Sequence, residues 1–282
     1  GFSDITKKDL EMILDEVITR PEIMKITKDS EGNEFAELSG SFAANAGITV
    51  RGTYQEDDSF HMDYYYPYVF GTSITTNEQI DVEKHAEKES YAGVCDEVNL
   101  GVTLIFYIQN VADYLAETNR HLSKIHYGAM LAGLSTEGKI LCPVVERKKN
   151  DVPAIQKNDR HNQLIAQARE GDEDAIESLT LEDMDTYALL SQRVMKEDIF
   201  SIVKSTFMPF GIESDQYTVL GEIIDCVTME NKLTHEKLYG MKLLCNNIQF
   251  DVCINEKDLL GEPAIGRRFR GNVWMQGNLC LE

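Results

Sequence analysis

The sequence has no uninterrupted apolar run near the roughly 20 residues that a membrane-spanning helix requires. Its most apolar stretch, residues 102–108, is far too short to cross a bilayer. The regions of a signal peptide are also missing, because the chain moves directly into an amphipathic helical pattern. The first residue is Gly1 rather than methionine, so we expect a processed, trimmed or tagged form. No membrane partner is predicted.

Paired cysteine motifs are missing as well. The six cysteines are scattered along the chain, and none lies at the CxxC spacing of a redox or zinc motif. Four of them stand inside apolar or alternating stretches, as Cys142 does between Leu141 and Pro143. Buried, reduced thiols are typical of proteins from a reducing compartment. The cysteines therefore predict a cytoplasmic protein.

Positive charge is scarce. The chain of 282 residues has 27 lysines and arginines against 48 aspartates and glutamates, a formal net charge of −21. Residues 201–282 hold 8 basic and 11 acidic residues, so −18 of this charge lies in residues 1–200. A protein that neutralises nucleic-acid phosphates needs clustered lysine and arginine. The charge therefore disfavours general binding of nucleic acid or of anionic membranes.

The composition is otherwise that of a globular protein, with 43% hydrophobic and 27% charged residues. Residues 1–146 combine a helix, opened by a capping box at Thr6–Asp9, with strand patterns of period two. One predicted hairpin turns at residues 55–59 and another at Ser135–Gly138. Residues 101–107 are expected to form a strand that is followed by a helix. This region is predicted to be an α+β domain with a largely antiparallel sheet.

Two further regions complete the predicted architecture. Residues 147–200 have helical patterns and no strand signal, which predicts an acidic helical connector. Residues 201–282 hold several short strand patterns and a helical turn at residues 256–260, which favour a small β-barrel of the OB type. The predicted fold class is thus α+β, with an N-terminal mixed α/β domain, a helical connector and a C-terminal small barrel.

Phosphate-loop, dinucleotide-binding and HExxH motifs are missing, so no known catalytic signature identifies a reaction. The most suggestive constellation lies in a short charged segment, where an extended backbone would project alternate side chains from one face. These side chains are Glu83, His85, Glu87 and Glu89, with Cys95 and Asp96 soon after. Imidazole and carboxylate groups suit zinc, iron or manganese, and such a carboxylate can also act as an acid or base.

The candidates from this segment fall into two overlapping groups. The catalytic candidates are His85, Glu87 and Glu89, and the metal candidates are Glu83, His85, Glu87 and Cys95. A solvated helix face explains the same residues, because Lys84 and Lys88 stand four residues apart. No cofactor is predicted.

One basic cluster stands beside aromatic residues near the end of the chain. Its candidate ligand-binding residues are Arg267, Arg268, Arg270 and Trp274. On a small barrel, arginines beside exposed rings can bind single-stranded nucleic acid or another anionic ligand. The alternative is that Phe269 and Trp274 fill the barrel while the arginines pair with the acidic surface of the chain.

Two other patterns bear on possible sites. The acidic segment Asp29–Glu34 lacks the spacing and the closing glutamate of an EF-hand, so we predict a turn rather than a calcium loop. The run Tyr64–Tyr68 places rings on both faces of one strand, so one face is core and the other is a candidate interface. A two-sided sheet packed under a helix explains the tyrosines equally well.

Four stretches resemble a known family. They are Glu83–Cys95, Glu177–Tyr187, Phe250–Pro263 and Gly266–Trp274. They are similar to a family of uncharacterised proteins from clostridial gut bacteria, known as a domain of unknown function, and the resemblance covers nearly the whole chain. It implies a bacterial cytoplasmic location and carries over no activity, ligand or catalytic residue.

The sequence therefore leads to two main hypotheses. The first is a non-enzymatic binding or scaffolding protein that contacts an unknown protein partner. The alternative is a metal-dependent hydrolase that uses His85, Glu87 and Glu89. An anionic-ligand site in the C-terminal region is a third possibility, and the oligomeric state is left open.

Overall fold

The computed structural model describes residues 1–2, 5–85, 88–120, 126–143, 178 and 203–281. The chain divides into two compact units, of which the first is Gly1–Cys142 together with Ser205–Glu282 and the second is Pro143–Lys204. Every helix and strand named below belongs to the first unit.

The described residues form two α-helices, fourteen strands and one short 3-10 helix. Their bounds are α1 Lys7–Thr19, β1 Ile23–Lys28, β2 Glu34–Ala43, β3 Ala46–Tyr54, β4 Phe60–Val69, β5 Thr76–Lys84, β6 Tyr91–Glu97, β7 Val102–Ile108, α2 Val111–Asn119, β8 His126–Leu141, β9 Thr206–Pro209, β10 Gln216–Glu230, β11 Lys237–Cys245, β12 Ile248–Asn255, η1 Glu256–Asp258, β13 Leu259–Leu260 and β14 Arg268–Leu279.

Helix α1 begins at the predicted capping box and ends shortly before a proline. The Thr6 hydroxyl accepts a hydrogen bond from the Asp9 amide at 3.2 Å, and the Asp9 carboxylate accepts one from the Thr6 amide at 3.0 Å. The helix stops at Thr19, two residues before Pro21, because proline lacks an N–H and disfavours the helical conformation in the residue before it. The predicted capping box is confirmed.

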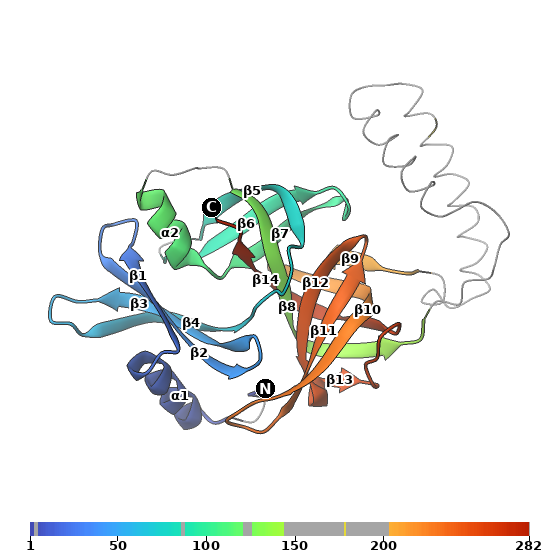
Figure 1. Cartoon of the computed structure of the whole chain (residues 1–282), viewed down its shortest axis with the longest axis horizontal. Helices are drawn as coiled ribbons and strands as arrows, with labels where there is room; N and C mark the ends of the chain where they lie inside the picture. The colour runs from blue at the N-terminus through green and yellow to red at the C-terminus, as the bar shows by residue number, and fades with distance from the viewer. Residues whose placement is uncertain (3–4, 86–87, 121–125, 144–177, 179–202, 282) are drawn as a thin grey trace. The chain divides into compact units, whose positions relative to one another are not determined.

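Strands β1 to β4 form an antiparallel sheet in sequence order, and the turn predicted at residues 55–59 joins β3 to β4. Because side chains alternate, one face of the sheet carries Leu38 and Val50 against α1 and the other carries Glu37 and Arg51. Helix α2 contacts β1 and β2 from the side of the sheet opposite α1 (Figure 1).

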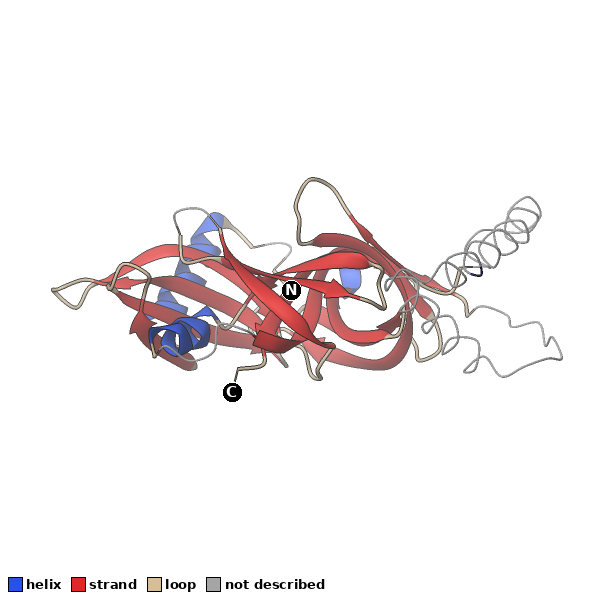
Figure 2. Cartoon of the chain, turned by 90° about the horizontal axis from the view of Figure 1, so that it is seen from above, coloured by secondary structure: helices blue, strands red, loops and turns tan. Residues whose placement is uncertain are grey.

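The other ten strands form one larger sheet in the order β11-β12-β8-β5-β6-β7-β14-β10-β9, with β13 beside β8. Additional pairings join β10 to β11 and β8 to β14, and the strands curl strongly (Figure 2). The turn between β11 and β12 is made by Asn246 and Asn247, which both have positive φ, of 47° and 68°, a conformation that asparagine tolerates.

The hairpin predicted at Ser135–Gly138 is wrong. Ser135–Gly138 is not a turn, because β8 continues through it to Leu141. The register against β14 shifts there, with Ser135 opposite Val273 and Glu137 opposite Asn272. Thr136 is the extra residue of a β-bulge, so the polar, glycine-ended segment that is typical of a turn instead bends a long strand.

The predicted fold class is wrong. The described residues are mostly strand, in two sheets, rather than a balanced α+β mixture. Residues 201–282 do not form an OB-type barrel of their own, because β12 and β14 pair with β8, which precedes the connector. Apart from Ser178, the helical connector predicted at 147–200 lies outside the described residues.

Separate apolar clusters hold the two sheets. The largest is centred on the larger sheet, with Phe106, Phe250 and Phe269, and also takes in Phe35 of β2 and part of α2, while a second lies between α1 and the smaller sheet. Smaller clusters, one of them built from Tyr66, Tyr68 and the ring of Trp274, join the two sheets. No helix within the described residues is long and apolar enough to cross a membrane.

Candidate functional site

The structure separates most of the residues predicted for a metal or catalytic site. Strand β5 ends at Lys84, so the alternation that would align Glu83 with Glu89 stops at the turn. His85 and Glu83 are exposed, Cys95 is buried in the core of the larger sheet, and Glu87 lies outside the described residues. Within the part of the chain that the structure describes, no three metal-binding side chains converge.

Glu89 is the exception, because it is buried in a polar cluster. Its Oε1 accepts hydrogen bonds from Ser30 Oγ at 2.5 Å and from Lys84 Nζ at 2.7 Å. The hydroxyl of Tyr91 donates to Oε2, and Lys84 also donates to Ser30 Oγ at 2.7 Å. The cluster joins the β1–β2 turn to the β5–β6 hairpin, segments that are 59 residues apart.

The electrostatics of this cluster favour a structural clamp over a nucleophile. Burial opposes ionisation of Glu89, but hydrogen bonds from Lys84, Ser30 and Tyr91 outweigh it and hold the pKa of Glu89 below its usual value. A carboxylate with a lowered pKa is a weak base, so it does not activate the Ser30 hydroxyl effectively. Asp29, beside it, accepts hydrogen bonds from the Glu31 and Asn33 amides, which confirms the predicted turn.

The predicted arginine cluster does not form a common surface. Arg268 is buried and donates from Nε to the carbonyl oxygen of Cys142 at 2.9 Å, whereas Arg267 is exposed and donates to the carbonyl oxygen of Glu262. Arg270 is also exposed. The Trp274 indole donates to Asp215 at 2.7 Å, and its ring packs against Tyr107 with centroids 5.3 Å apart.

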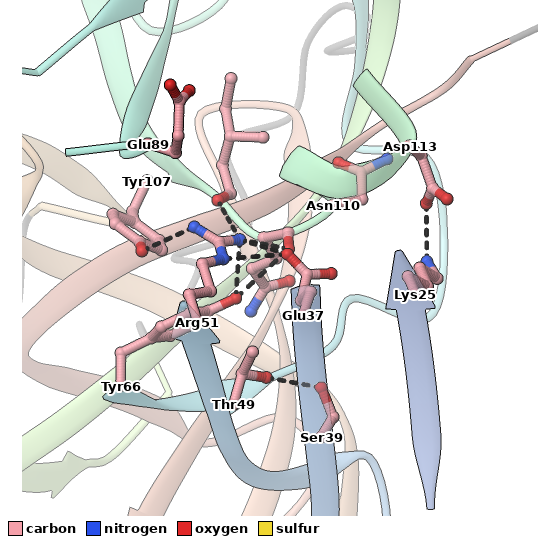
Figure 3. A network of polar contacts seen from close by, with 12 residues as sticks. Lys25, Glu37, Ser39, Thr49, Arg51, Tyr66, Glu89, Tyr107, Asn110 and Asp113 are labelled. Carbon is pink, nitrogen blue, oxygen red and sulfur yellow. Dashed lines mark hydrogen bonds and ion pairs between the residues drawn. The ribbon is translucent and has the colours of Figure 1, made fainter. Parts of the chain in front are cut away.

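The strongest polar network was not predicted from the sequence. Arg51 of β3 is fully buried, and its Nε donates to the Glu37 carboxylate at 2.9 Å. Its two terminal nitrogens donate to hydroxyl and carbonyl groups of β4, β7 and the residue after β7. These acceptors are the hydroxyls of Tyr64, Tyr66 and Tyr107 and the carbonyls of Ile108 and Gln109. Figure 3 shows the guanidinium between Glu37, Tyr66 and Tyr107.

Charge and burial oppose each other in this network. Burial raises the pKa of Glu37, and the Arg51 guanidinium counteracts that rise. Burial alone would lower the pKa of Arg51, but Tyr66 and Glu37 outweigh it and hold that pKa above its usual value. Because Arg51 reaches from the smaller sheet to β7 of the larger one, the network fastens the two sheets together.

The sequence contained one sign of this network. Side chains alternate along a strand, so Arg51 shares a face of β3 with the polar Thr49 rather than with Ile48 and Val50.

A pair of glutamines extends this junction. Gln109 Nε2 donates to the Val69 carbonyl at 2.9 Å and to Gln276 Oε1 at 2.7 Å. Gln276 Nε2 in turn donates to the carbonyl of Pro67 at 2.8 Å. Among the described residues Gln109 Oε1 has no hydrogen-bond partner, but the other side-chain groups of this pair are bonded, so the region is suited to rigidity rather than to catalysis.

Two of the concave regions within the described residues are candidate binding sites. The larger, about 550 Å³, is a groove between α1 and the β10–β11 loop. It is lined by Ile5, Asp9, Met12, Ile13, Glu16, Leu233, Thr234, Glu236 and Lys257. The other, about 320 Å³, lies where the two sheets meet and has mainly apolar walls. Both are formed by segments far apart in the chain, so neither was predicted from the sequence.

Comparison with known proteins gives one match. A family model described as "Domain of unknown function, E. rectale Gene description (DUF3881)" matches residues 1–277. No curated protein matches the chain, and no solved structure matches it. The resemblance seen in the sequence is confirmed, because the family model covers nearly the full length. The chain belongs to the family described as a domain of unknown function, DUF3881.

Proposed function

We propose that this protein is a non-enzymatic binding or scaffolding protein of the bacterial cytoplasm. Its binding surface is the groove beside α1, and its ligand is a basic, partly apolar segment of a protein partner. The observation that carries the proposal is the combination of exposed apolar side chains and carboxylates in one groove of about 550 Å³.

The apolar part of the groove comes from both walls. Met12 of α1 is 56% exposed and Leu233 of the facing loop is 49% exposed. Ile5 and Ile13 line the groove between them. Large apolar side chains that stay exposed on opposite walls of one groove are typical of a surface that a partner covers.

The acidic residues of the groove favour a partner with positive charge. Asp9, Met12, Ile13 and Glu16 all line the groove and fall at helical spacing on one face of α1. On the other wall Glu236 is already paired with Lys257 at 2.9 Å, so Asp9 and Glu16 supply the net negative charge of the groove. Carboxylates around an apolar floor complement lysine or arginine side chains that flank an apolar one.

The net charge and the cysteines of the whole chain support a cationic partner and a cytoplasmic location. A net charge of −21 attracts cationic segments and accelerates their association. All six cysteines are free thiols, which supports a reducing compartment such as the cytoplasm.

A peptide-binding experiment tests the proposal. Fluorescence polarisation would compare a labelled peptide that alternates lysine with leucine and a counterpart with glutamate in place of lysine, at physiological ionic strength. We expect the wild type to bind the basic peptide and not the acidic one. The double variant Met12→Lys/Leu233→Lys should bind the basic peptide about tenfold more weakly or worse, a change of about 1.4 kcal/mol.

The matched control separates the groove from general attraction to an acidic protein. Ile212 and Ile265 are 100% and 67% exposed and do not line the groove. The variant Ile212→Lys/Ile265→Lys carries the same change of charge and should bind like the wild type. Equal weakening in the two double variants would contradict the proposal, because attraction would then depend on net charge alone.

A further inference from the structure

The second concave region is a cavity of about 320 Å³ between the two sheets. The smaller sheet contributes Phe42, Tyr68 and the β2–β3 hairpin, and the larger sheet contributes Leu134, Leu238 and Ile254. It shares no lining residue with the groove beside α1. The cavity is therefore a separate site.

Small side chains create the space. Ala43 and Ala46 line the cavity at the β2–β3 hairpin, where they are 3% and 8% exposed. They are joined by Gly47, at which an added Cβ would lie 2.7 Å from the Tyr68 hydroxyl oxygen. The hairpin thus lets the Tyr68 ring reach the cavity wall while no large side chain fills the gap.

Two aromatic rings in the wall are held in fixed orientations. Tyr68 stacks on Phe70 with ring centroids 4.3 Å apart and an interplanar angle of 26°. Phe42 packs edge-on against Phe2, with centroids 5.3 Å apart and an angle of 82°. Rings that are already ordered lose little entropy when a ligand contacts them, so they provide a prepared apolar surface.

The polar groups of the lining define the charge that the ligand can have. The Ser135 hydroxyl oxygen lies 2.7 Å from the carbonyl oxygen of Asn272 and 2.9 Å from that of Glu137, so its one hydrogen is directed to the protein. Burial raises the pKa of Tyr68 to about 12, which keeps its hydroxyl protonated. Asp258 and Gly1 both line the cavity, and the Asp258 carboxylate interacts with the Gly1 amino group, so the two opposite charges offset each other and favour an uncharged ligand.

We propose that this cavity binds an uncharged, mainly apolar small molecule with a ring system. The volume equals about ten water molecules at about 30 Å³ each and falls at the lower end of the range for ligand pockets. Bound there, the ligand contacts both sheets, so it stabilises their junction as well as the folded state as a whole.

A fluorescence titration with N-phenyl-1-naphthylamine, an uncharged apolar ring compound, tests the site. We expect saturable binding of one probe per chain and a rise in Tm on binding. Leu134→Trp places an indole in the cavity and should weaken binding by about tenfold or more. Leu260→Trp makes the same exchange at a position that is 66% exposed and does not line the cavity, so it should bind like the wild type.

A second measurement uses the wild-type chain, so it tests the site even if Leu134→Trp fails to fold. Cys253 lines the cavity, and Cys142 is exposed outside it. Modification of each thiol by methyl methanethiosulfonate would be followed by peptide mass spectrometry at alkaline pH, because burial raises the pKa of Cys253 to about 11. The probe should slow modification of Cys253 severalfold and leave Cys142 unchanged.

Three results would overturn the proposal. They are absence of saturable probe binding to the wild type, equal binding by folded Leu134→Trp and Leu260→Trp, and an unchanged rate at Cys253 under saturating probe. None of them bears on the peptide groove, which is tested by a different ligand and by different variants.

Discussion

Arg51 is the residue whose environment departs most from what its chemistry favours. A guanidinium with no exposed surface has lost its hydration, and the five neighbours that accept its hydrogen bonds, together with Glu37, replace it. The ring of Tyr66 lies 4.8 Å from the guanidinium carbon and adds a cation–π contact. Removal of the arginine therefore leaves a buried carboxylate and several hydroxyl groups without their partner.

We predict that Arg51→Met lowers the free energy of unfolding by about 3–5 kcal/mol, the usual cost of breaking a buried ion pair from one side. Urea denaturation measures the change. Arg20→Met is the matched control, because Arg20 is exposed, and it should change stability by less than about 0.5 kcal/mol. A loss in Arg51→Met no larger than in the control would show that the network does not hold the sheets.

At the scale of elements, Glu89 has the role of a clamp between two hairpins. Ser30 and Lys84 approach the same carboxylate oxygen from the β1–β2 turn and from the end of β5. The side-chain ion pair of Lys84 and Glu89 spans 2.7 Å, and Lys84 is 33% exposed at its side chain. The clamp therefore depends on ionisation of Glu89.

The lowered pKa of Glu89 determines how the contribution of the clamp to the free energy of unfolding changes with pH. A carboxyl group whose pKa is lower in the folded state contributes stability above its ordinary value of 4.5, and the contribution is lost as the pH falls through the folded value. We predict that Glu89→Gln is less stable than the wild type at pH 7 and that the difference shrinks as the pH falls below 4.5. Denaturation at several pH values measures it.

Glu83→Gln is the control for this prediction, because Glu83 is exposed near the same hairpin. Its stability should match that of the wild type at pH 7. A Glu89→Gln variant whose deficit is the same at acidic and neutral pH would show that the loss comes from packing rather than from charge.

At the scale of the whole molecule, the net charge of −21 is the dominant electrostatic feature. Acidic groups in such excess repel each other, and salt screens that repulsion over about 10 Å at 0.1 M ionic strength. The groove beside α1 lies within this field, so its acidic residues add local selectivity to a general attraction for cations.

We predict that Tm at neutral pH rises with added sodium chloride. Screening that relieves about 1–2 kcal/mol corresponds to about 2–6 °C for a protein of this size. The same titration near pH 4.6, the isoelectric point of the sequence, should show little change because the net charge is then close to zero. A Tm that falls with salt at neutral pH would mean that ion pairs outweigh repulsion between like charges.

The sequence by itself determined the features that depend on neighbours in the chain. The capping box at Thr6 and Asp9 defined the start of α1, and Asn246 with Asn247 defined a tight turn. The polar segment at 55–59 marked the β3–β4 hairpin. These determinants are local hydrogen bonds and local backbone preferences, so they act before any distant segment is in place.

Tertiary structure decided the remainder, because the deciding contacts join residues that are far apart in the chain. Ser135–Gly138 has the composition of a turn but forms a bulge, since β14 pairs with β8 on both sides of it, from Ala129 to Leu141. Arg51 is buried because Tyr107 and Gln109 close over it, and both are more than 50 residues away in the chain. The groove and the cavity exist for the same reason, as their opposing walls meet only when the two sheets have assembled.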